Sequence, residues 1–425
     1  MKLAIDQARL TSEIEHLATF SDAEAPAVTR VVFTPTDLKA RAWIKERCQD
    51  AGLTIREDPV GNTFARWSGD PTQSQRTRLN GPPESNDLVV GTGSHIDAIP
   101  NAGKYDGVVG VLGGLEAIRA LQVSAFRPKH SIELLIFTSE EPTRFGIGCL
   151  GSRLLSGTLS AEAAGKLLDS AGITLEDARV RAGMKGSLEQ VRLPSGYYKA
   201  FVELHIEQGP LLEREGLSLG VVERIAAPAS LRLTFEGAGG HAGGVLMPDR
   251  RDALCAAAEL ILALESTAKT TGSINTVATV GICDVFPGAV NSIPAKVSLS
   301  VDVRDTNLER RDSVLKTLEE TCRAVEVQRR VAIRSELLNA DAPAESATDV
   351  VSALRQACEK YSLRYLSMTS RAYHDSLFIS RIAPMAMLFI PCRHGYSHRP
   401  DEYAAPEDIA RGALVLAETL AALAS

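Results

Sequence analysis

The chain has 425 residues, of which 44% are hydrophobic and 23% are charged, and its formal net charge is −7. This composition is typical of a soluble globular protein with room for two domains. The negative net charge disfavours binding to the phosphate backbone of a nucleic acid. No apolar run reaches the roughly 18 residues that indicate a membrane helix. The seven cysteines include no C-x-x-C pair, and the N-terminal segment lacks a signal-peptide apolar region, so we expect a cytoplasmic protein.

Strand-like and helix-like segments alternate in the first half of the chain. Apolar runs typical of buried strands occur at 87–95, 131–139 and 198–205, whereas 107–122 has the spacing of a helix. Strands separated by helices predict a mostly parallel sheet with helices on both faces. The polar segment 68–86, rich in Pro, Gly and Ser, is predicted to be a surface loop.

The pattern changes between residues 220 and 339, where the strands alternate apolar and polar side chains. In chain order we expect a strand, a helix, two strands, a helix and a strand, at 230–236, 252–265, 275–283, 297–304, 310–325 and 329–337. This order is typical of a ferredoxin-like antiparallel sheet covered by two helices. The sequence therefore predicts an α/β domain, formed by residues 1–219 and 340–425, that is interrupted by an α+β domain at 220–339.

Histidines and carboxylates follow four predicted strands of the α/β domain at the points where these strands end. They are His95, Asp97, Asp106, Glu140, Glu141, His205 and His398. In open α/β sheets, sites form outside the carboxyl ends of strands, so we expect these side chains to meet. Each alone has a simpler explanation, such as a surface hydrogen-bonded pair or a solvated turn. Their convergence favours a dinuclear metal site, which needs a bridging carboxylate, imidazoles and further carboxylates.

Several segments carry a resemblance to a known family: HIDAIPNAGKYDGVVGVLGGLEA, FTSEEPTRFGIGCLGSRLL, ELHIEQGP, GGHAG and GYSHRPDEY. Over nearly the whole chain the sequence resembles the amidase/hydantoinase/carbamoylase family of dinuclear metallohydrolases. The resemblance implies a metal-dependent exopeptidase-like catalytic domain and a ferredoxin-like inserted domain that acts as lid and dimerisation domain. Within the family, KYDGVVGVLG, SEEPTRFGI and SRAYHDSLF are most similar to the ureidoglycolate amidohydrolase branch, whereas HAGGVLMP and RAYHDS depart from the typical carbamoylase segments.

The resemblance also implies a metal-ligand set. One metal ion would be held by His95, Asp106 and His205, and a second by Asp106, Glu141 and His398, so that Asp106 bridges the two. Manganese is implied by the branch, although histidine and carboxylate ligands accept either Mn²⁺ or Zn²⁺.

Two neighbouring carboxylates are implied to act without binding metal. Glu140 would be the general base, and Asp97 would hydrogen-bond the far nitrogen of His95 and fix its tautomer.

From the inserted domain, His241 would reach the active site of a partner subunit in a homodimer. The inserted domain would be joined at two crossings, near Gly220 and Asn339, that act as a hinge.

Four further residues are matched to substrate-binding positions. Asn291 and Arg304 would grip the substrate carboxylate, Gln208 would face its polar end, and His374 would lie at the pocket rim. Arg suits a carboxylate because its planar fork binds bidentately, although an edge salt bridge with a neighbouring aspartate is the simpler interpretation of Arg304.

The substrate implied is (S)-ureidoglycolate, which would be hydrolysed to glyoxylate, ammonia and CO₂. Hydrolysis of allantoate or of an N-carbamoyl-L-amino acid remains the alternative within the same class. A dinuclear dipeptidase and a peptidase-like binding protein without activity are the more remote alternatives.

Overall fold

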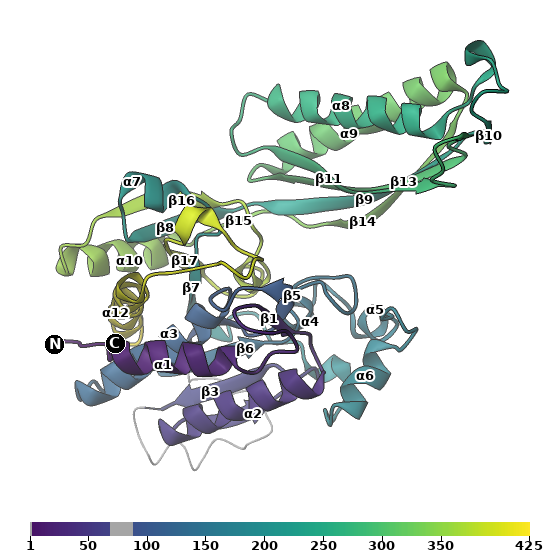
Figure 1. Ribbon diagram of the computed structural model, residues 1–425. Helices are drawn as coiled ribbons and strands as arrows, with labels where there is room; N and C mark the ends of the chain where they lie inside the picture. Colours follow the sequence, from purple (N-terminus) through teal and green to yellow (C-terminus); the bar gives the residue numbers. More distant parts are fainter. Residues whose placement is uncertain (1, 69–87) are drawn as a thin grey trace. The chain divides into compact units, whose positions relative to one another are not determined.

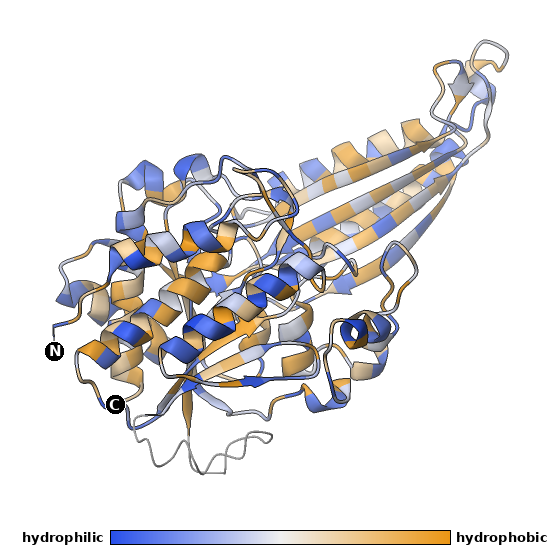
Figure 2. Cartoon of the chain, turned by 60° about the horizontal axis from the view of Figure 1, so that its bottom comes forward, coloured by the Kyte–Doolittle hydropathy of each residue, from blue (hydrophilic) through white to orange (hydrophobic). Residues whose placement is uncertain are grey.

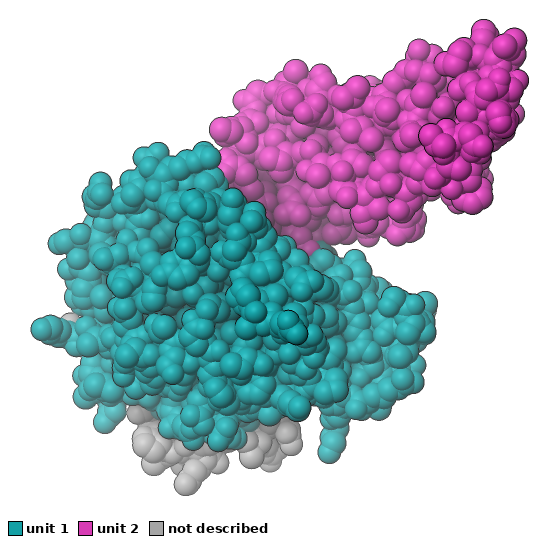
Figure 3. All heavy atoms as spheres, viewed as in Figure 1, with its two compact units in different colours: residues 1–223, 345–368, 374–425 teal, residues 224–344, 369–373 magenta. Residues whose placement is uncertain are grey.

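The computed structural model describes residues 2–68 and 88–425, which form two compact units (Figure 1 and Figure 3). Unit 1 consists of Met1–Glu223, Glu345–Met368 and His374–Ser425, and unit 2 of Arg224–Ala344 and Thr369–Tyr373. The chain therefore passes between the units four times, whereas the sequence predicted two crossings. Except for Ser68, the predicted loop at 68–86 lies outside the described residues. Within the described ranges, no helix is long and apolar enough to cross a membrane.

Unit 1 contains a mixed sheet with the order β15-β8-β17-β7-β4-β6-β3-β2, in which β16 also pairs with β8. Its strands are β2 (Thr54–Glu57), β3 (Thr63–Trp67), β4 (Val89–His95), β6 (Ser131–Phe137), β7 (Tyr198–Ile206), β8 (Leu219–Ile225), β15 (Ala344–Glu345), β16 (Tyr365–Ser370) and β17 (Met385–Ile390). The central strands β17, β7, β4 and β6 are parallel, whereas β2, β3 and β8 pair antiparallel. This confirms the predicted parallel centre and adds antiparallel strands at the edges.

Helices cover both faces of this sheet, which explains why β4, β6 and β17 are buried along their whole length and mostly apolar (Figure 2). On one face, α3 (Val108–Val123) and α12 (Pro406–Leu423) pack so closely that Leu204 of β7 lies against Gly113 and Gly412. On the other face, Glu203 of β7 accepts hydrogen bonds from Ser376 of α11 (Asp375–Ile379). Polar side chains of β7 thus lie on the face opposite α3 and α12.

The remaining elements of unit 1 surround this sandwich. They are α1 (Gln7–Ala18), β1 (Val28–Arg30), which pairs with β5 (Ala98–Ala102), α2 (Pro35–Asp50), α4 (Leu150–Ser156), α5 (Ala161–Gly165), α6 (Leu175–Arg181), α7 (Leu211–Glu215) and α10 (Thr348–Lys360), together with the 3-10 helices η1 (Leu188–Gln190) and η3 (Arg393–Gly395).

Unit 2 has the predicted ferredoxin-like order. Its antiparallel sheet β11-β13-β9-β14 is covered by two helices, and its elements are β9 (Ala227–Glu236), α8 (Ala253–Lys269), β11 (Val277–Phe286), β13 (Lys296–Asp305), α9 (Leu308–Arg329) and β14 (Ala332–Ala340). Alternate residues of β13 are buried, as an antiparallel sheet with one covered face requires. A small ribbon of β10 (Gly240–His241) and β12 (Ser292–Ile293) and the 3-10 helix η2 (Met247–Asp249) complete the unit.

Candidate metal centre

The predicted metal-site residues lie where the central parallel strands of unit 1 end. His95 is the last residue of β4, and His205 is the last but one of β7. Glu140 and Glu141 follow β6, and His398 lies between β17 and α12. Asp106 lies on the turn between β5 and α3. Parallel pairing of β6, β4, β7 and β17 brings these ends to one edge of the sheet.

The first cluster consists of His95, Asp106 and His205, whose ligand atoms all lie within 4.8 Å of one another. Nε2 of His95 is 3.4 Å from Oδ1 of Asp106, and Nε2 of His205 is 3.2 Å from the same oxygen. All three residues are buried. This is the set predicted to hold the first metal ion.

Hydrogen bonds fix which nitrogen of each histidine faces Asp106. Nδ1 of His95 lies 3.1 Å from the carbonyl oxygen of Asp97, and Nδ1 of His205 lies 2.9 Å from that of Ile206. Because a carbonyl oxygen only accepts, each Nδ1 carries a proton, and in the neutral ring the lone pair is on Nε2. Nε2 of His95 is buried and makes no hydrogen bond.

The first cluster therefore attracts positive charge. Burial alone would lower the pKa of His95, but the neighbouring Asp106 and Glu140 carboxylates outweigh it and raise that pKa well above its ordinary value. Burial would likewise raise the pKa of Asp106, but the two histidines hold it well below its ordinary value. An unbonded Nε2 that faces a carboxylate fits a divalent cation between them.

The second cluster consists of Asp106, Glu141 and His398. Nε2 of His398 is 3.1 Å from Oε1 of Glu141 and 3.5 Å from Oδ2 of Asp106. The contact with Glu141 raises the pKa of His398 to about 9. Asp106 thus presents Oδ1 to one cluster and Oδ2 to the other, as a bridging carboxylate does.

Asp97 contacts the backbone of both glutamates. Its Oδ1 accepts the N–H of Glu140 at 3.2 Å, and its Oδ2 accepts that of Glu141 at 3.0 Å. The carboxylate is 3.6 Å from Nδ1 of His95, so the carbonyl oxygen of Asp97 makes the shorter contact that orients the ring. The carboxylate instead fixes the turn that carries both glutamates.

Glu140 belongs to neither cluster among the described residues. Its Oε2 is 3.8 Å from Nε2 of His95, and its Oε1 accepts a hydrogen bond from Sγ of Cys149 at 3.2 Å. Burial, with the neighbouring Glu141 carboxylate, raises the pKa of Glu140 well above its ordinary value, despite the opposing effect of His95. A buried carboxylate that lies beside both clusters and belongs to neither is suitably placed to exchange protons with a molecule bound there.

Two polar residues beside Asp106 constrain its outer oxygen. Nε2 of Gln208 and Oγ of Ser397 both donate to Oδ2 of Asp106, each at 2.6 Å. Gln208 has a left-handed φ of 54° and a buried Oε1 without a hydrogen-bond partner. It therefore lies beside the metal cluster, with one acceptor available to a ligand.

Glu402 is a site residue that the sequence did not single out. It is 4% exposed, and its Oε1 accepts the N–H groups of Tyr105 and Asp106 at 2.8 and 3.2 Å. Its Oε2 lies 3.0 Å from Oγ of Ser397. Glu402 thus joins the loop of His398 to the turn of Asp106. Its position in the segment GYSHRPDEY, four residues after His398, could have indicated a role in the site. Nothing in this polar segment, however, predicts that Glu402 is buried.

His374 lies deeper than predicted. It is 2% exposed, and its ring centroid is 4.5 Å from that of His205, so it is not at a pocket rim. With Glu203 and His205 it forms a third group of potential ligands. Both carboxylate oxygens of Glu203 accept hydrogen bonds, Oε1 from Ser94 and Oε2 from Ser376.

The candidate residues of unit 2 lie at two ends of its sheet. His241 is exposed and pairs with Ser292 across the β10–β12 ribbon, beside Asn291, whose carbonyl accepts the N–H of Ala242. Arg304 lies near the end of β13, eight residues after its first residue, Lys296. Asn291 therefore lies with His241 and not with Arg304, although the sequence had paired Asn291 with Arg304.

Arg304 has partners of its own within unit 2. Its guanidinium bonds Asp302 at 2.7 and 3.3 Å, lies 3.4 Å from the carbonyl oxygen of Arg371, and lies over the ring of Tyr373. The simpler interpretation of Arg304, an edge salt bridge, is thus realised. With these contacts, the Arg304 side chain as a whole remains 26% exposed.

Comparisons with known proteins agree on one family. Residues 91–422 match the model of Peptidase family M20/M25/M40. A ureidoglycolate hydrolase of Arabidopsis thaliana is 50% identical over 428 residues, covering 99% of this chain and 87% of that protein. A crystal structure of AtUAH in complex with (S)-hydroxyglycine superposes with a TM-score of 0.89 at 50% identity, covering 99% and 98% of the two chains. An amidase of the hydantoinase/carbamoylase family from Burkholderia multivorans gives 0.86 at 31% identity, covering 99% and 98%.

Proposed function

Because the chain belongs to Peptidase family M20/M25/M40, we propose that it is a metal-dependent amidohydrolase that cleaves the ureido C–N bond of a small carboxylate, with (S)-ureidoglycolate as its substrate. The observation that carries this proposal is Asp106, which presents one oxygen to each of two clusters of metal-ligand type. The relative named for ureidoglycolate is 50% identical over nearly all of this chain, which favours that substrate.

The proposed ligands follow from the two clusters. His95 and His205 would hold one ion, Glu141 and His398 the other, and Asp106 would bridge. Two such ions, manganese or zinc, supply Lewis acidity and lower the pKa of a bound water. Asp97 would keep Glu141 in place because its carboxylate accepts the backbone N–H of Glu141.

Glu140 would move the protons. Its Oε2 faces His95, so it can take a proton from the attacking water and return it to the leaving nitrogen. Hydrolysis of the ureido group releases CO₂ and ammonia and leaves a 2-hydroxyglycine. Loss of a second ammonia from that product gives glyoxylate, so the overall reaction yields two ammonia molecules for each glyoxylate.

Unit 2 would supply substrate contacts from two chains. From Lys296 to Arg304, β13 spans roughly 26 Å, at about 3.3 Å per residue. His241 and Asn291 lie beyond the Lys296 end, so one small ureido carboxylate cannot touch both this pair and Arg304 of the same chain. Since the family resemblance assigns His241 to the site of a partner subunit, Asn291 would act there with it, and Arg304 would act in the chain's own site. Gln208 and His374 would complete the pocket from unit 1.

The edge of the unit 2 sheet supports a homodimer. β11 is an outer strand, and among the described residues only β13 pairs with it. Ile282 and Phe286 of β11 are 54% and 65% exposed, and Leu262 of α8 is 66% exposed. Natural proteins rarely leave a long apolar edge strand uncovered, so a second copy is its proposed partner.

A parallel product assay tests the substrate. The chain, stripped of metal and reloaded with Mn²⁺ or Zn²⁺, is given ureidoglycolate, allantoate, several N-carbamoyl-L-amino acids and a dipeptide. We expect the highest kcat/KM with ureidoglycolate, and two equivalents of ammonia for each glyoxylate. Faster turnover of allantoate or of a carbamoyl amino acid would replace the substrate and keep the chemistry. Dipeptide cleavage alone, or no turnover with any metal, would overturn the proposal.

A further inference from the structure

The thiol of Cys149 is the one side-chain hydrogen-bond donor to Glu140 that the described residues provide within 3.5 Å. Its Sγ lies 3.2 Å from Oε1 of Glu140, whereas Oε2 of Glu140 faces Nε2 of His95 at 3.8 Å. The two oxygens of the carboxylate are thus distinct: one is held by sulfur and the other faces the first metal cluster. This inference rests on the role proposed above for Glu140.

The backbone holds Cys149 in a conformation that brings its thiol to Glu140. Cys149 has left-handed dihedral angles, φ 55° and ψ 36°, directly before α4. Its N–H donates to the carbonyl oxygen of Glu140 at 2.7 Å. Oγ of Ser152 contacts the carbonyl oxygen of Cys149 at 3.1 Å and Oδ1 of Asp375 at 2.5 Å. A left-handed non-glycine residue costs free energy, and these contacts offset that cost.

Cys149 differs from the cysteines of the apolar core. Cys48 is equally buried, but it lies in the hydrophobic cluster of unit 1. Burial and the adjacent Glu140 carboxylate raise the pKa of the Cys149 thiol well above its ordinary value, so the sulfur keeps the proton that it donates. A thiol is a weak donor, so it can orient a carboxylate and still leave it basic.

We propose that Cys149 is a positioning residue for Glu140: its S–H holds Oε1, so that Oε2 remains directed at the first metal cluster. Without the thiol, the Glu140 side chain would be free to rotate within its pocket. Small misplacements of a reacting group lower kcat, whereas they leave ligands and substrate contacts unchanged.

The test compares Cys149→Ala and Cys149→Ser with Cys48→Ala as the matched control. We expect Cys149→Ala to lower kcat roughly tenfold, the low end for a hydrogen bond to a charged group. KM and the metal bound per chain should stay unchanged. Cys149→Ser, which restores a donor, should recover most of the lost kcat, and Cys48→Ala should keep the kcat of the parent chain. Thermal unfolding of each variant separates loss of position from loss of fold.

A double-mutant cycle shows whether the thiol acts through Glu140. Glu140→Asp withdraws the carboxylate by about 1.5 Å, the length of one C–C bond, and so breaks its contact with Sγ. We expect Cys149→Ala to reduce kcat no further in this background. Should the alanine variant fail to fold, Cys149→Gly, which also lacks the thiol and suits the left-handed backbone at this position, enters the cycle in its place.

Several results would overturn the inference. These are an unchanged kcat in Cys149→Ala, a loss confined to KM or metal content, or effects that simply add in the cycle. A failure of the proposed function looks different, because Glu140→Asp by itself would then leave turnover intact or the parent chain would lack activity. Metal content and unfolding temperature are read in either case.

Discussion

The two units differ in where they place charge. Unit 1 buries a group of histidines and carboxylates at one end of its sheet: His95, Asp97, Asp106, Glu140, Glu141, Glu203 and His205. In unit 2 the buried charged residues are Asp305 and Arg311, and Asp305 is bonded by Thr276 and Arg310. Its candidate functional residue His241 is exposed.

This difference reflects two ways of building a site. Burying charge is costly unless partners or a bound ion compensate it, so an unbonded buried nitrogen such as Nε2 of His95 indicates a function. An exposed histidine carries no such cost and no such signal. Its function has to come from what approaches it, which in unit 2 is proposed to be a second chain.

The largest loss of kcat is expected from changing Glu140, the buried carboxylate that is not proposed to bind metal. Glu140→Gln should lower kcat by roughly 100- to 10,000-fold, the range of general acid–base catalysis, and should retain both metal equivalents. Elemental analysis alongside steady-state kinetics checks both parts. Loss of one metal equivalent would show that Glu140 is a ligand and that the roles of the two glutamates are reversed.

The next effect separates the bridging residue from its neighbour. Asp106→Ala should abolish binding of both metals, because it removes an oxygen from each cluster. Asp97→Ala, which removes only the acceptor for two backbone N–H groups, should weaken binding by about 10- to 100-fold. Metal titration of the two apoproteins measures this. Equal losses of metal affinity in the two variants would show that Asp106 and Asp97 do not differ as ligand and supporting residue.

A third experiment asks whether the exposed residues of unit 2 act in another chain. Inactive His241→Ala and Glu140→Gln chains, mixed after dissociation, should regain about a quarter of full activity, because half of randomly formed dimers are mixed and one of their two sites is intact. Asn291→Ala should complement Glu140→Gln in the same way, and Arg304→Ala should not. If mixed dimers form and stay inactive, His241 does not act across the interface.

A smaller effect is expected for Glu402→Gln. The amide oxygen of Gln can still accept the N–H groups of Tyr105 and Asp106, so the turn should persist. Replacing the carboxylate oxygen that contacts Oγ of Ser397 by an amide NH₂ should weaken metal binding by about tenfold, as changes next to ligands do. The affinity of the metal for the apoprotein is the readout. A chain that folds normally with unchanged affinity would make Glu402 a purely structural residue.

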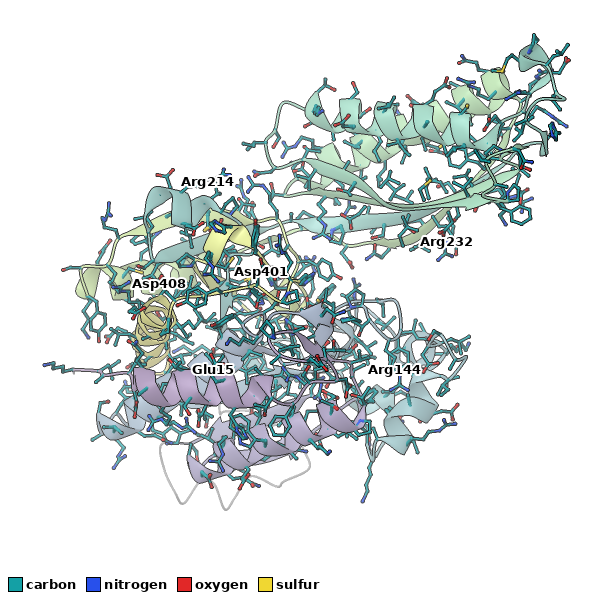
Figure 4. All side chains as sticks on the ribbon, viewed as in Figure 1. Glu15, Arg144, Arg214, Arg232, Asp401 and Asp408 are labelled. Carbon is teal, nitrogen blue, oxygen red and sulfur yellow. The ribbon has the colours of Figure 1, made fainter. Side chains whose placement is uncertain are left out.

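The smallest effect is expected on the open face of unit 2. Arg232 pairs with Glu336 at 3.2 Å on the side of the sheet away from α8 and α9 (Figure 4). Exposed pairs contribute little, so Arg232→Ala should change the free energy of unfolding by less than about 1 kcal/mol. Leu233→Ala, on the covered face, should cost about 2–5 kcal/mol. Denaturant unfolding of both variants measures the contrast.

The spacing of apolar residues along the chain was enough to predict the folds of both units, because burial of one or both faces of a sheet determines that spacing. The alternation at 297–304 became β13, and the continuous apolar run at 87–95 became β4, because one sheet has a covered face and the other has two. The strand-end histidines were visible for a similar reason: chain order and parallel pairing place them together.

What the sequence did not reveal depends on contacts between distant segments. Glu402 is far from Asp106 in the chain, and no local pattern shows that its carboxylate accepts the N–H of Asp106. In the sequence, nothing distinguishes Cys149 from the other cysteines; only the structure shows that its sulfur contacts Glu140. The pairing of Asn291 with His241 likewise arises from the β10–β12 ribbon, whose two-residue strands are too short to leave a periodic signal.

The short return of Thr369–Tyr373 to unit 2 bears on how this gene can be dissected. A fragment encoding only Arg224–Ala344 would omit Ser370, whose carbonyl oxygen accepts the N–H of Ala226. It would also omit Arg371, whose carbonyl oxygen contacts Arg304 and whose guanidinium bonds Asn275. A recombinant version of unit 2 therefore requires these five residues to be grafted back by a designed linker, since cutting at the two most obvious boundaries leaves the unit incomplete.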